Sequence, residues 1–227
     1  MNILFHRVPL LYLMFFNPVR LFDRISRDPW YSQSQQQWID ALRLPHGARV
    51  LELGCGPGGL ALELTRRGCC VTALDSSKKM VRHLSYRAKQ ESLSVEALVG
   101  DALSTDLPTG SCDAVIGASL LNVVTLPEAL LAEAMRLVKP GGVVSFYFPT
   151  HLFSQSNVHD LVRAQDVPGA SAAILLTWAE KANKLSPAVA ESLFTGAGAQ
   201  AIEVRVYLGG MLSSVSGRRA GQPGTDH

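Results

Sequence analysis

The feature that most restricts the fold of this chain is the segment 50–59, which reads Val-Leu-Glu-Leu-Gly-Cys-Gly-Pro-Gly-Gly. It predicts an apolar strand that carries an acid near its end, followed by a glycine-rich turn that opens a helix. Glycine can adopt positive φ and has no Cβ, so the backbone can lie directly against a ligand, and the free N–H groups at the helix start face the same loop. Tight turns also use glycine for purely structural reasons, so the loop alone does not establish a binding site.

Helix-like and strand-like segments alternate from residue 32 onward, which predicts an α/β fold with a parallel sheet covered by helices on both faces. Ser32 and Gln35 form a capping-box pattern that would start the first helix. Gly209 and Gly210 indicate the turn of a C-terminal hairpin. The expected helices span residues 32–44, 60–67, 77–90, 127–138 and 187–194, and the expected strands span residues 49–53, 70–74, 95–99, 114–118, 143–148, 202–208 and 212–216.

The length and composition predict one main domain at residues 32–217, since 227 residues with 47% hydrophobic content can bury a core. Residues 150–185 show no clear strand and are interpreted as an inserted cap. Residues 218–227 are expected to be a disordered tail.

The N-terminal segment 1–31 contains an apolar run at residues 8–16, which is well short of the ~20 residues that a membrane-spanning helix needs. No small-residue cleavage site follows it, so we expect a cytoplasmic protein. The segment is interpreted either as a lid over a bound ligand or as an interfacial segment that makes peripheral membrane contact, because arginines flank the apolar run.

Charge and cysteine content disfavour two classes of function. The 21 basic and 19 acidic residues are mixed along the chain, so we expect no nucleic-acid partner. The four cysteines form no C-x-x-C pair and have no histidine cluster nearby, so we expect neither a metal site nor a disulfide framework.

Two further carboxylates follow predicted strands. Asp75 follows the strand 70–74, where its carboxylate can accept hydrogen bonds from both hydroxyls of a ribose, and Asp101 follows the strand 95–99. Because ligands of open α/β sheets bind outside the carboxyl ends of the strands, both acids are expected at the ligand-binding edge. The turn Lys139-Pro140-Gly141-Gly142 precedes the fifth strand.

Taken together, these motifs resemble the class I S-adenosylmethionine-dependent methyltransferases, and within them the small-molecule group that includes quinone-biosynthesis methyltransferases. The resemblance covers residues 32–149 and, more loosely, 187–217. It implies a Rossmann-like seven-stranded sheet in the order 3-2-1-4-5-7-6 with strand 7 antiparallel. It also implies S-adenosylmethionine as cofactor and S-adenosylhomocysteine as product.

The resemblance also implies roles for individual residues. Asp75 would hold the ribose hydroxyls, and Asp101 would accept a hydrogen bond from the adenine amine with Ala102 beside it. Ser119 and Leu120 would line the site near the transferred methyl group. The other implied cofactor-binding residues are Glu52, Gly54, Cys55, Gly56 and Gly58 around the methionine and ribose, and Ser76 and Met80 along the adenosine.

Methyl transfer from a sulfonium is an in-line displacement that requires orientation and desolvation but no metal. A neutral acceptor would benefit from a general base, and His151, just past the fifth strand, is the candidate; Asn122, Tyr147 and Trp178 are further candidates for the pocket wall. The sequence after the fourth strand lacks the Asn/Asp-Pro-Pro-aromatic signature of DNA and protein amino-methyltransferases. A small acceptor is therefore expected: a thiol, a phenol or quinone, an amine or a lipid-like molecule.

Two other functions stay open at this point. An NAD-dependent oxidoreductase needs the same sheet and the same ribose-binding acid, although the glycine pattern differs from G-x-G-x-x-G. A non-catalytic cofactor-binding module would carry the same motifs. The protein is expected to be a monomer or a homodimer.

Overall fold

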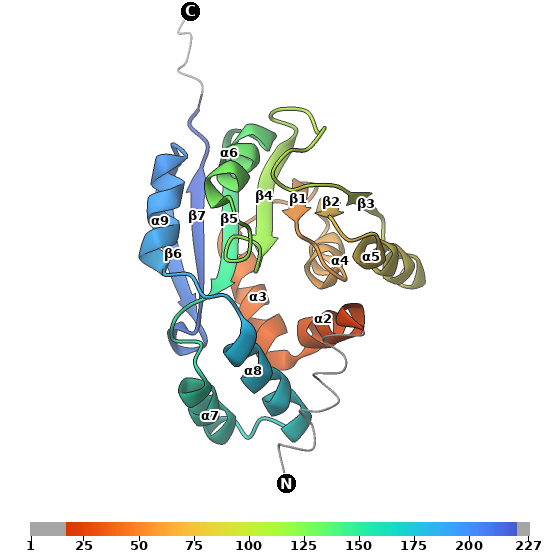
Figure 1. The fold of residues 1–227 in the computed structure, drawn as a ribbon. Helices are drawn as coiled ribbons and strands as arrows, with labels where there is room; N and C mark the ends of the chain where they lie inside the picture. Colours follow the sequence, from red (N-terminus) through yellow and green to blue (C-terminus); the bar gives the residue numbers. More distant parts are fainter. Residues whose placement is uncertain (1–16, 222–227) are drawn as a thin grey trace, which may run out of the picture.

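The computed structural model describes residues 17–221, and its centre is a seven-stranded sheet in the order β3-β2-β1-β4-β5-β7-β6 (Figure 1). Strands β1 to β5 pair in parallel, and β7 runs antiparallel to both β5 and β6. The strand order and the direction of β7 confirm the fold that the motifs implied. The strands are β1 (Arg49–Leu53), β2 (Cys70–Asp75), β3 (Val95–Val99), β4 (Cys112–Ala118), β5 (Val138–Pro149), β6 (Gln200–Tyr207) and β7 (Leu212–Arg218).

Helices cover both faces of this sheet, and alternation of side chains along the strands divides the core into two clusters. In β1, Val50 belongs to one cluster while Leu51 and Leu53 belong to the other. Three helices pack over the Val50 side, and two over the opposite side. The first group is α3 (Pro29–Leu42), α4 (Gly59–Arg66) and α5 (Lys78–Gln90), and the second is α6 (Pro127–Leu137) and α9 (Pro187–Gly196).

Two local predictions were wrong. The first long helix does not start at a Ser32 capping box, because α3 begins at Pro29 after the N-cap Asp28. Proline at the first helical position has its φ already set for a helix and lacks an N–H that would otherwise be unpaired there. Strand β5 begins earlier than expected, at Val138, which pairs with Cys112.

Gly142 explains why the segment 139–142 can be part of a strand. A Cβ at this position would lie 2.8 Å from the carbonyl oxygen of Asp113, so only glycine permits this approach of β5 to β4. Gly142 thus serves close backbone packing, whereas Gly141 has a φ of 76° and open space where a Cβ would lie.

Further helices lie at the carboxyl-end edge of the sheet (Figure 1). The expected cap at 150–185 folds into α7 (Gln155–Ala164) and α8 (Gly169–Lys181), and α2 (Pro18–Arg27) lies beside them. The expected domain boundary at residue 32 falls inside α3, so residues 17–31 form α2 and the first turn of that helix. The apolar run 8–16 lies outside the described residues.

The C-terminal boundary also differs slightly from the expected one. Strand β7 continues through Arg218, and the backbone N–H of Arg219 donates to the carbonyl of Gly142. Residues 222–227 of the expected tail lie outside the described part. Among residues 17–221, every helix is too short or too polar to cross a bilayer.

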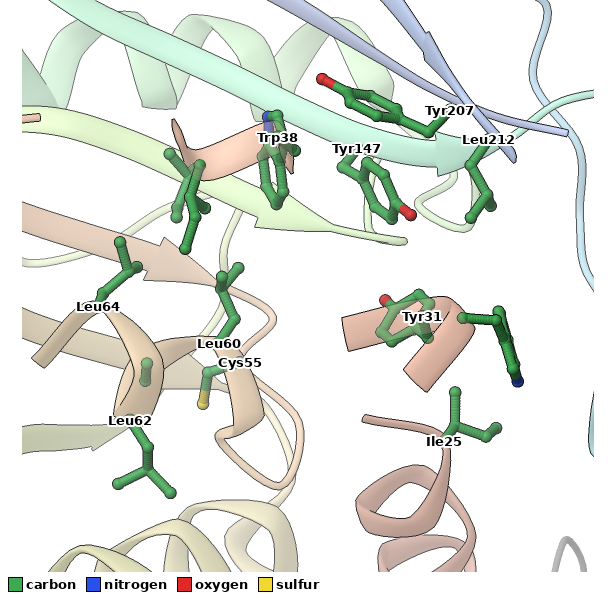
Figure 2. Packing of buried hydrophobic residues seen from close by; sticks show 14 of the residues in the cluster. Ile25, Tyr31, Trp38, Cys55, Leu60, Leu62, Leu64, Tyr147, Tyr207 and Leu212 are labelled. Atoms are coloured by element: carbon green, nitrogen blue, oxygen red, sulfur yellow. The ribbon is translucent and has the colours of Figure 1, made fainter. Parts of the chain in front are cut away.

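Trp38 anchors α3 to the centre of the sheet. Its indole Nε1 donates to Ser145 Oγ at 2.8 Å, and its ring stacks on Tyr147 at a centroid distance of 5.1 Å (Figure 2). The hydroxyl of Tyr147 in turn bonds to Ser34 Oγ at 2.7 Å. Ser145 Oγ also bonds to Ser216 Oγ at 2.7 Å and to the carbonyl of Val215 at 3.3 Å, so the indole N–H is one of its three partners.

We therefore expect Trp38→Phe to lower the free energy of unfolding by about 0.5–1.5 kcal/mol more than the loss of ring packing alone, since it removes one donor from Ser145 Oγ. Trp30→Phe is the matched control, because the indole N–H of Trp30 is buried without a hydrogen-bond partner. Urea unfolding of both variants measures the difference. An equal loss in the two variants would show that ring packing, and not the Trp38 hydrogen bond, holds α3 in place.

Candidate functional site

The loop between β1 and α4 is held by the carboxylate of Asp75 at the end of β2. Asp75 Oδ2 accepts from the backbone N–H of Gly56, and Oδ1 accepts from that of Ser77, both at 2.8 Å. The N–H of Cys55 donates to the carbonyl of Leu74 at 3.0 Å. Gly56 has a φ of 52° and would place a Cβ in open space, so the loop presents bare backbone on that side.

Glu52 is the penultimate residue of β1, and only 2% of its surface is exposed. Burial and then the nearby charge of Asp75 raise its pKa to about 8, although the backbone N–H of Ala61 partly offsets this rise. Its Oε2 is buried without a hydrogen-bond partner. A buried carboxylate oxygen without a partner is costly, so this site favours a ligand that supplies a positive charge or a donor.

A cavity of about 290 Å³ lies beside this loop and carries Glu52 in its wall. Eight of the twelve predicted cofactor-binding residues line it. They are Glu52, Gly54, Cys55, Gly56, Asp75, Met80, Ser119 and Leu120. Seven of them come from the ends of β1, β2 and β4, the edge at which α/β sheets bind ligands, and Met80 comes from α5.

Four predicted residues do not line this cavity. Gly58 is the N-cap of α4 with a φ of 86°, and a Cβ there would lie 2.2 Å from Leu84 Cδ1, so it serves helix packing. Ser76 and Asp101 are exposed and Ala102 is half-buried. Asp101 Oδ1 accepts from the N–H of Leu103 at 2.9 Å. The predicted adenine contacts of Asp101 and Ala102 stay predictions.

His151 lies in the turn after β5, exposed, and it does not line the cavity. The preceding Thr150 is buried and bonds to the carbonyl of Gly210 at 2.6 Å, which holds this turn against the hairpin. The arrangement therefore gives no support to His151 as a general base.

The sequence reasoning did not single out several residues of α2 and α3 that line the cavity. Phe22, Ile25 and Ser26 come from α2, while Tyr31 and Gln35 come from α3. Figure 2 shows Ile25 and Tyr31 across from Cys55 and Leu60. Only the interpretation of segment 1–31 as a possible lid pointed to this wall.

Tyr31 is buried in the cavity wall. Burial raises the pKa of its phenol, the nearby charge of Glu52 raises it further, and the hydroxyl of Ser119 lowers it in part. The phenol thus stays neutral near neutral pH. Its ring packs edge-to-face against Trp178 at 5.3 Å, which joins α3 to α8.

Helix α2 is held over the cavity by charge and by close packing. The carboxylate of Asp23 pairs with Arg87 of α5 at 2.9 Å and with Arg27 at 3.0 Å. A Cβ on Gly59 would lie 2.7 Å from Ser26 Cβ, so α2 approaches the start of α4 as closely as glycine allows. The same helix end meets α8, where Ser171 Oγ donates to Asp28 Oδ1.

Comparison with known proteins agrees with this geometry. Residues 50–142 match the family model of the methyltransferase domain. A ubiquinone biosynthesis O-methyltransferase from Paracidovorax citrulli is 35% identical over 112 residues, which cover 48% of this chain and 47% of that protein. The chain spans about half the length of the curated relatives it matches.

Solved structures share the fold. A S-adenosylmethionine-dependent methyltransferase from Aquifex aeolicus superposes with a TM-score of 0.67 at 19% identity, over 90% of this chain and 100% of that one. A putative S-adenosylmethionine-dependent methyltransferase from Methanococcus maripaludis gives a TM-score of 0.68 at 16% identity, over 90% and 93% of the two chains. Residues 50–142 thus match a methyltransferase-domain model, and the chain shares its fold with these methyltransferases. By sequence this domain resembles the quinone-biosynthesis type, as the motifs predicted.

The residues of the cavity fit S-adenosylmethionine, the cofactor of this class. The unpartnered Oε2 of Glu52 suits its positive charge, and the bare backbone at Gly56 leaves space for close approach. Each oxygen of Asp75 accepts one backbone N–H and has a lone pair left for a ribose hydroxyl. Glu52, Gly56 and Asp75 would therefore hold it.

Glu52 makes the stability of the ligand-free protein depend on pH. Its folded-state pKa of about 8 exceeds the unfolded value of 4.5, so the folded state binds the extra proton and stability falls as pH rises between the two values. We expect the stability of the native protein relative to Glu52→Gln to fall by up to about 1.4 kcal/mol per pH unit in this window. Urea unfolding at intervals from pH 5 to pH 8.5 measures it.

Glu133 is the control, because its pKa is shifted in the opposite direction from that of Glu52. Its pKa is lowered to about 2, first by the hydrogen bond from Arg136, so its contribution is present above the unfolded pKa and is lost only as pH falls through the folded value. Glu133→Gln should therefore reduce stability evenly across pH 5 to 8.5. A flat difference between native protein and Glu52→Gln would contradict the raised pKa of Glu52.

Proposed function

We propose that this protein transfers a methyl group from S-adenosylmethionine to a small-molecule acceptor by in-line displacement. The observation that carries the proposal is the buried, unpartnered carboxylate oxygen of Glu52 in a cavity bounded by the loop that Asp75 holds. The match of residues 50–142 to the methyltransferase domain supports it. The name of the relative from Paracidovorax citrulli supports an oxygen atom as the acceptor.

The sulfonium of S-adenosylmethionine supplies an activated methyl group with a good leaving group, so the chain's own residues need only bind, orient and exclude water. Asp75 would hold the ribose. A cationic ligand would favour the ionised form of Glu52, whose pKa is raised to about 8 in the ligand-free protein. Tyr31 and Trp178 close the cavity with aromatic surface. Within the described part of the chain, the cavity wall contains no histidine, and its two acids are Glu52 and Asp75.

The same observations weigh against an NAD-dependent oxidoreductase. A dinucleotide would bring the negative charge of its pyrophosphate to the glycine-rich loop, where Glu52 and Asp75 already place two carboxylates. A non-catalytic cofactor-binding module would share the site, and formation of S-adenosylhomocysteine in the presence of an acceptor separates an enzyme from such a module.

For the N-terminal segment we propose the lid rather than the membrane contact. Phe22 and Ile25 of α2 line the cavity, and the Asp23–Arg87 pair fixes α2 over it. Closure over the ligand would exclude water from the reacting groups. A cytoplasmic location and the monomeric or dimeric state are likewise proposals.

The lid and the membrane contact predict different results in a flotation assay. We expect the full chain to stay at the bottom of a density gradient with anionic liposomes, both with and without S-adenosylhomocysteine. Arg20→Glu/Arg24→Glu is the control variant, because both arginines are exposed on α2 and would face an anionic surface. If the native chain floated and the variant did not, membrane contact would be established.

The first test of the function is calorimetric titration of S-adenosylmethionine and S-adenosylhomocysteine into the purified protein. We expect micromolar binding of both, and a loss of at least about 100-fold with Asp75→Ala, because two loop N–H groups and the ribose hydroxyls lose their acceptor at once. Asp160→Ala, an exposed acid on α7, is the control and should bind as the native protein does. Absence of binding to the native protein would refute the proposed function.

A further inference from the structure

A second cavity, of about 360 Å³, opens between α2, the segment after β4 and α8. It shares five wall residues with the first cavity, so a molecule in one lies against the same side chains as a molecule in the other. The shared residues are Phe22, Ile25, Ser119, Val123 and Trp178. If the first cavity holds the cofactor, as the proposed function states, the second is the adjoining space for the acceptor.

The backbone is strained where the two cavities meet. Ser119 has a φ of 54°, a left-handed conformation that is unfavourable for a residue with a Cβ. Its N–H donates to the carbonyl of Tyr147 at 2.6 Å, which fixes the end of β4 against β5. Strain of this kind is found where the surrounding structure imposes a geometry that a binding site requires.

Two described side chains of the second cavity, Ser119 and Asn122, carry a buried oxygen without a hydrogen-bond partner, and of these Asn122 does not line the first cavity. Asn122 Nδ2 donates to the backbone carbonyl of Asn183 at 2.8 Å. Because only the amide nitrogen can donate, this hydrogen bond distinguishes Nδ2 from Oδ1. Its Oδ1 is buried and has no hydrogen-bond partner. The side chain is therefore held in place with an acceptor available for a donor on a ligand.

The rest of the second cavity offers little to a charged molecule. No acid is among the described residues that line it, and its one basic residue, Lys181, pairs with Glu180 at 2.8 Å. The hydroxyl of Thr177 donates to the carbonyl of Ala173 within α8. The remaining wall is mainly apolar, with Leu21, Phe22, Ile25, Val123, Ile174, Trp178 and Ala182.

We propose that the second cavity binds the methyl acceptor, and that this acceptor is an uncharged molecule with an apolar body whose reacting hydroxyl or amine N–H donates to Asn122 Oδ1. Asn122 is then the residue that determines specificity and aims the lone pair of the reacting atom. That lone pair forms the new C–O or C–N bond as the C–S bond breaks, the bonding electrons return to sulfur, and the released proton passes to water.

Three probes with one ring system test the chemistry of this site in the full chain saturated with S-adenosylhomocysteine. They are 2-naphthol, which has a donor, 2-methoxynaphthalene, which lacks it, and 2-naphthoate, which is charged. By calorimetry we expect 2-naphthol to bind about 5–10-fold more tightly than 2-methoxynaphthalene, because it makes one additional hydrogen bond. We expect 2-naphthoate to bind more weakly than 2-methoxynaphthalene.

Two variants locate the binding. Asn122→Leu should remove the preference for naphthol over its methyl ether and leave the affinity for S-adenosylhomocysteine within about twofold, since Asn122 lines only the second cavity. Ala182→Phe should abolish naphthol binding by filling that cavity. Ala188→Phe, the same change at an exposed site on α9, should alter neither ligand.

Each outcome has a distinct meaning. Failure of the native protein to bind S-adenosylhomocysteine would overturn the proposed function itself. Binding of S-adenosylhomocysteine without binding of naphthol would overturn the acceptor site alone, as would naphthol binding that Ala182→Phe leaves intact. A preference for naphthol that persists in Asn122→Leu would overturn the role of Asn122.

Discussion

The candidate site depends on the hydrogen bonds of the Asp75 carboxylate to the loop that follows β1. The parallel pairing of β1 with β2, in which Leu53 lies opposite Leu74, brings the end of each strand to the same level. Asp75 can then accept from Gly56 and Ser77 at once and fix the starts of two helices, α4 and α5. The conformation of the loop after β1 therefore depends, through Asp75, on the register in which β1 pairs with β2.

Glu52 is a buried acid near the end of β1, and its Oε2 has no hydrogen-bond partner. The sheet buries its carboxylate close to Asp75, and the two like charges raise the cost of ionising Glu52. An apolar residue would stabilise the ligand-free fold better at this position, because a buried polar atom without a partner is unfavourable. The sequence therefore violates a packing rule at the point where a cationic ligand would compensate for it, which is where such violations are expected in functional proteins.

The sequence alone predicted the parts of the molecule that depend on local pattern. Strands such as β1 and β3 were located to the residue because each is a short run of strand-forming residues bounded by turn signals. The family resemblance of the motifs predicted eight residues that line the first cavity, and most of them lie in or next to those turns. Contacts made by segments distant in sequence were not predicted. Nothing local in Phe22 or Ser26 indicates that α2 reaches the first turn of α4, and nothing local in Thr150 indicates its hydrogen bond to Gly210.

This division between local and distant contacts also separates the two cavities. The cavity beside Glu52 is built largely from residues within 50–142, the part that matches the methyltransferase domain, whereas most of the second cavity comes from α2 and α8, outside that match. Similarity to relatives through residues 50–142 therefore informs the cofactor more strongly than the acceptor. Asn122 is the exception, because it lies within the matched part yet lines only the second cavity. Its amide is held by the backbone of Asn183, beyond α8, so the shared fold places the residue while the inserted segment orients it. Changes in the inserted segment could thus alter acceptor choice without disturbing the loop that Asp75 holds.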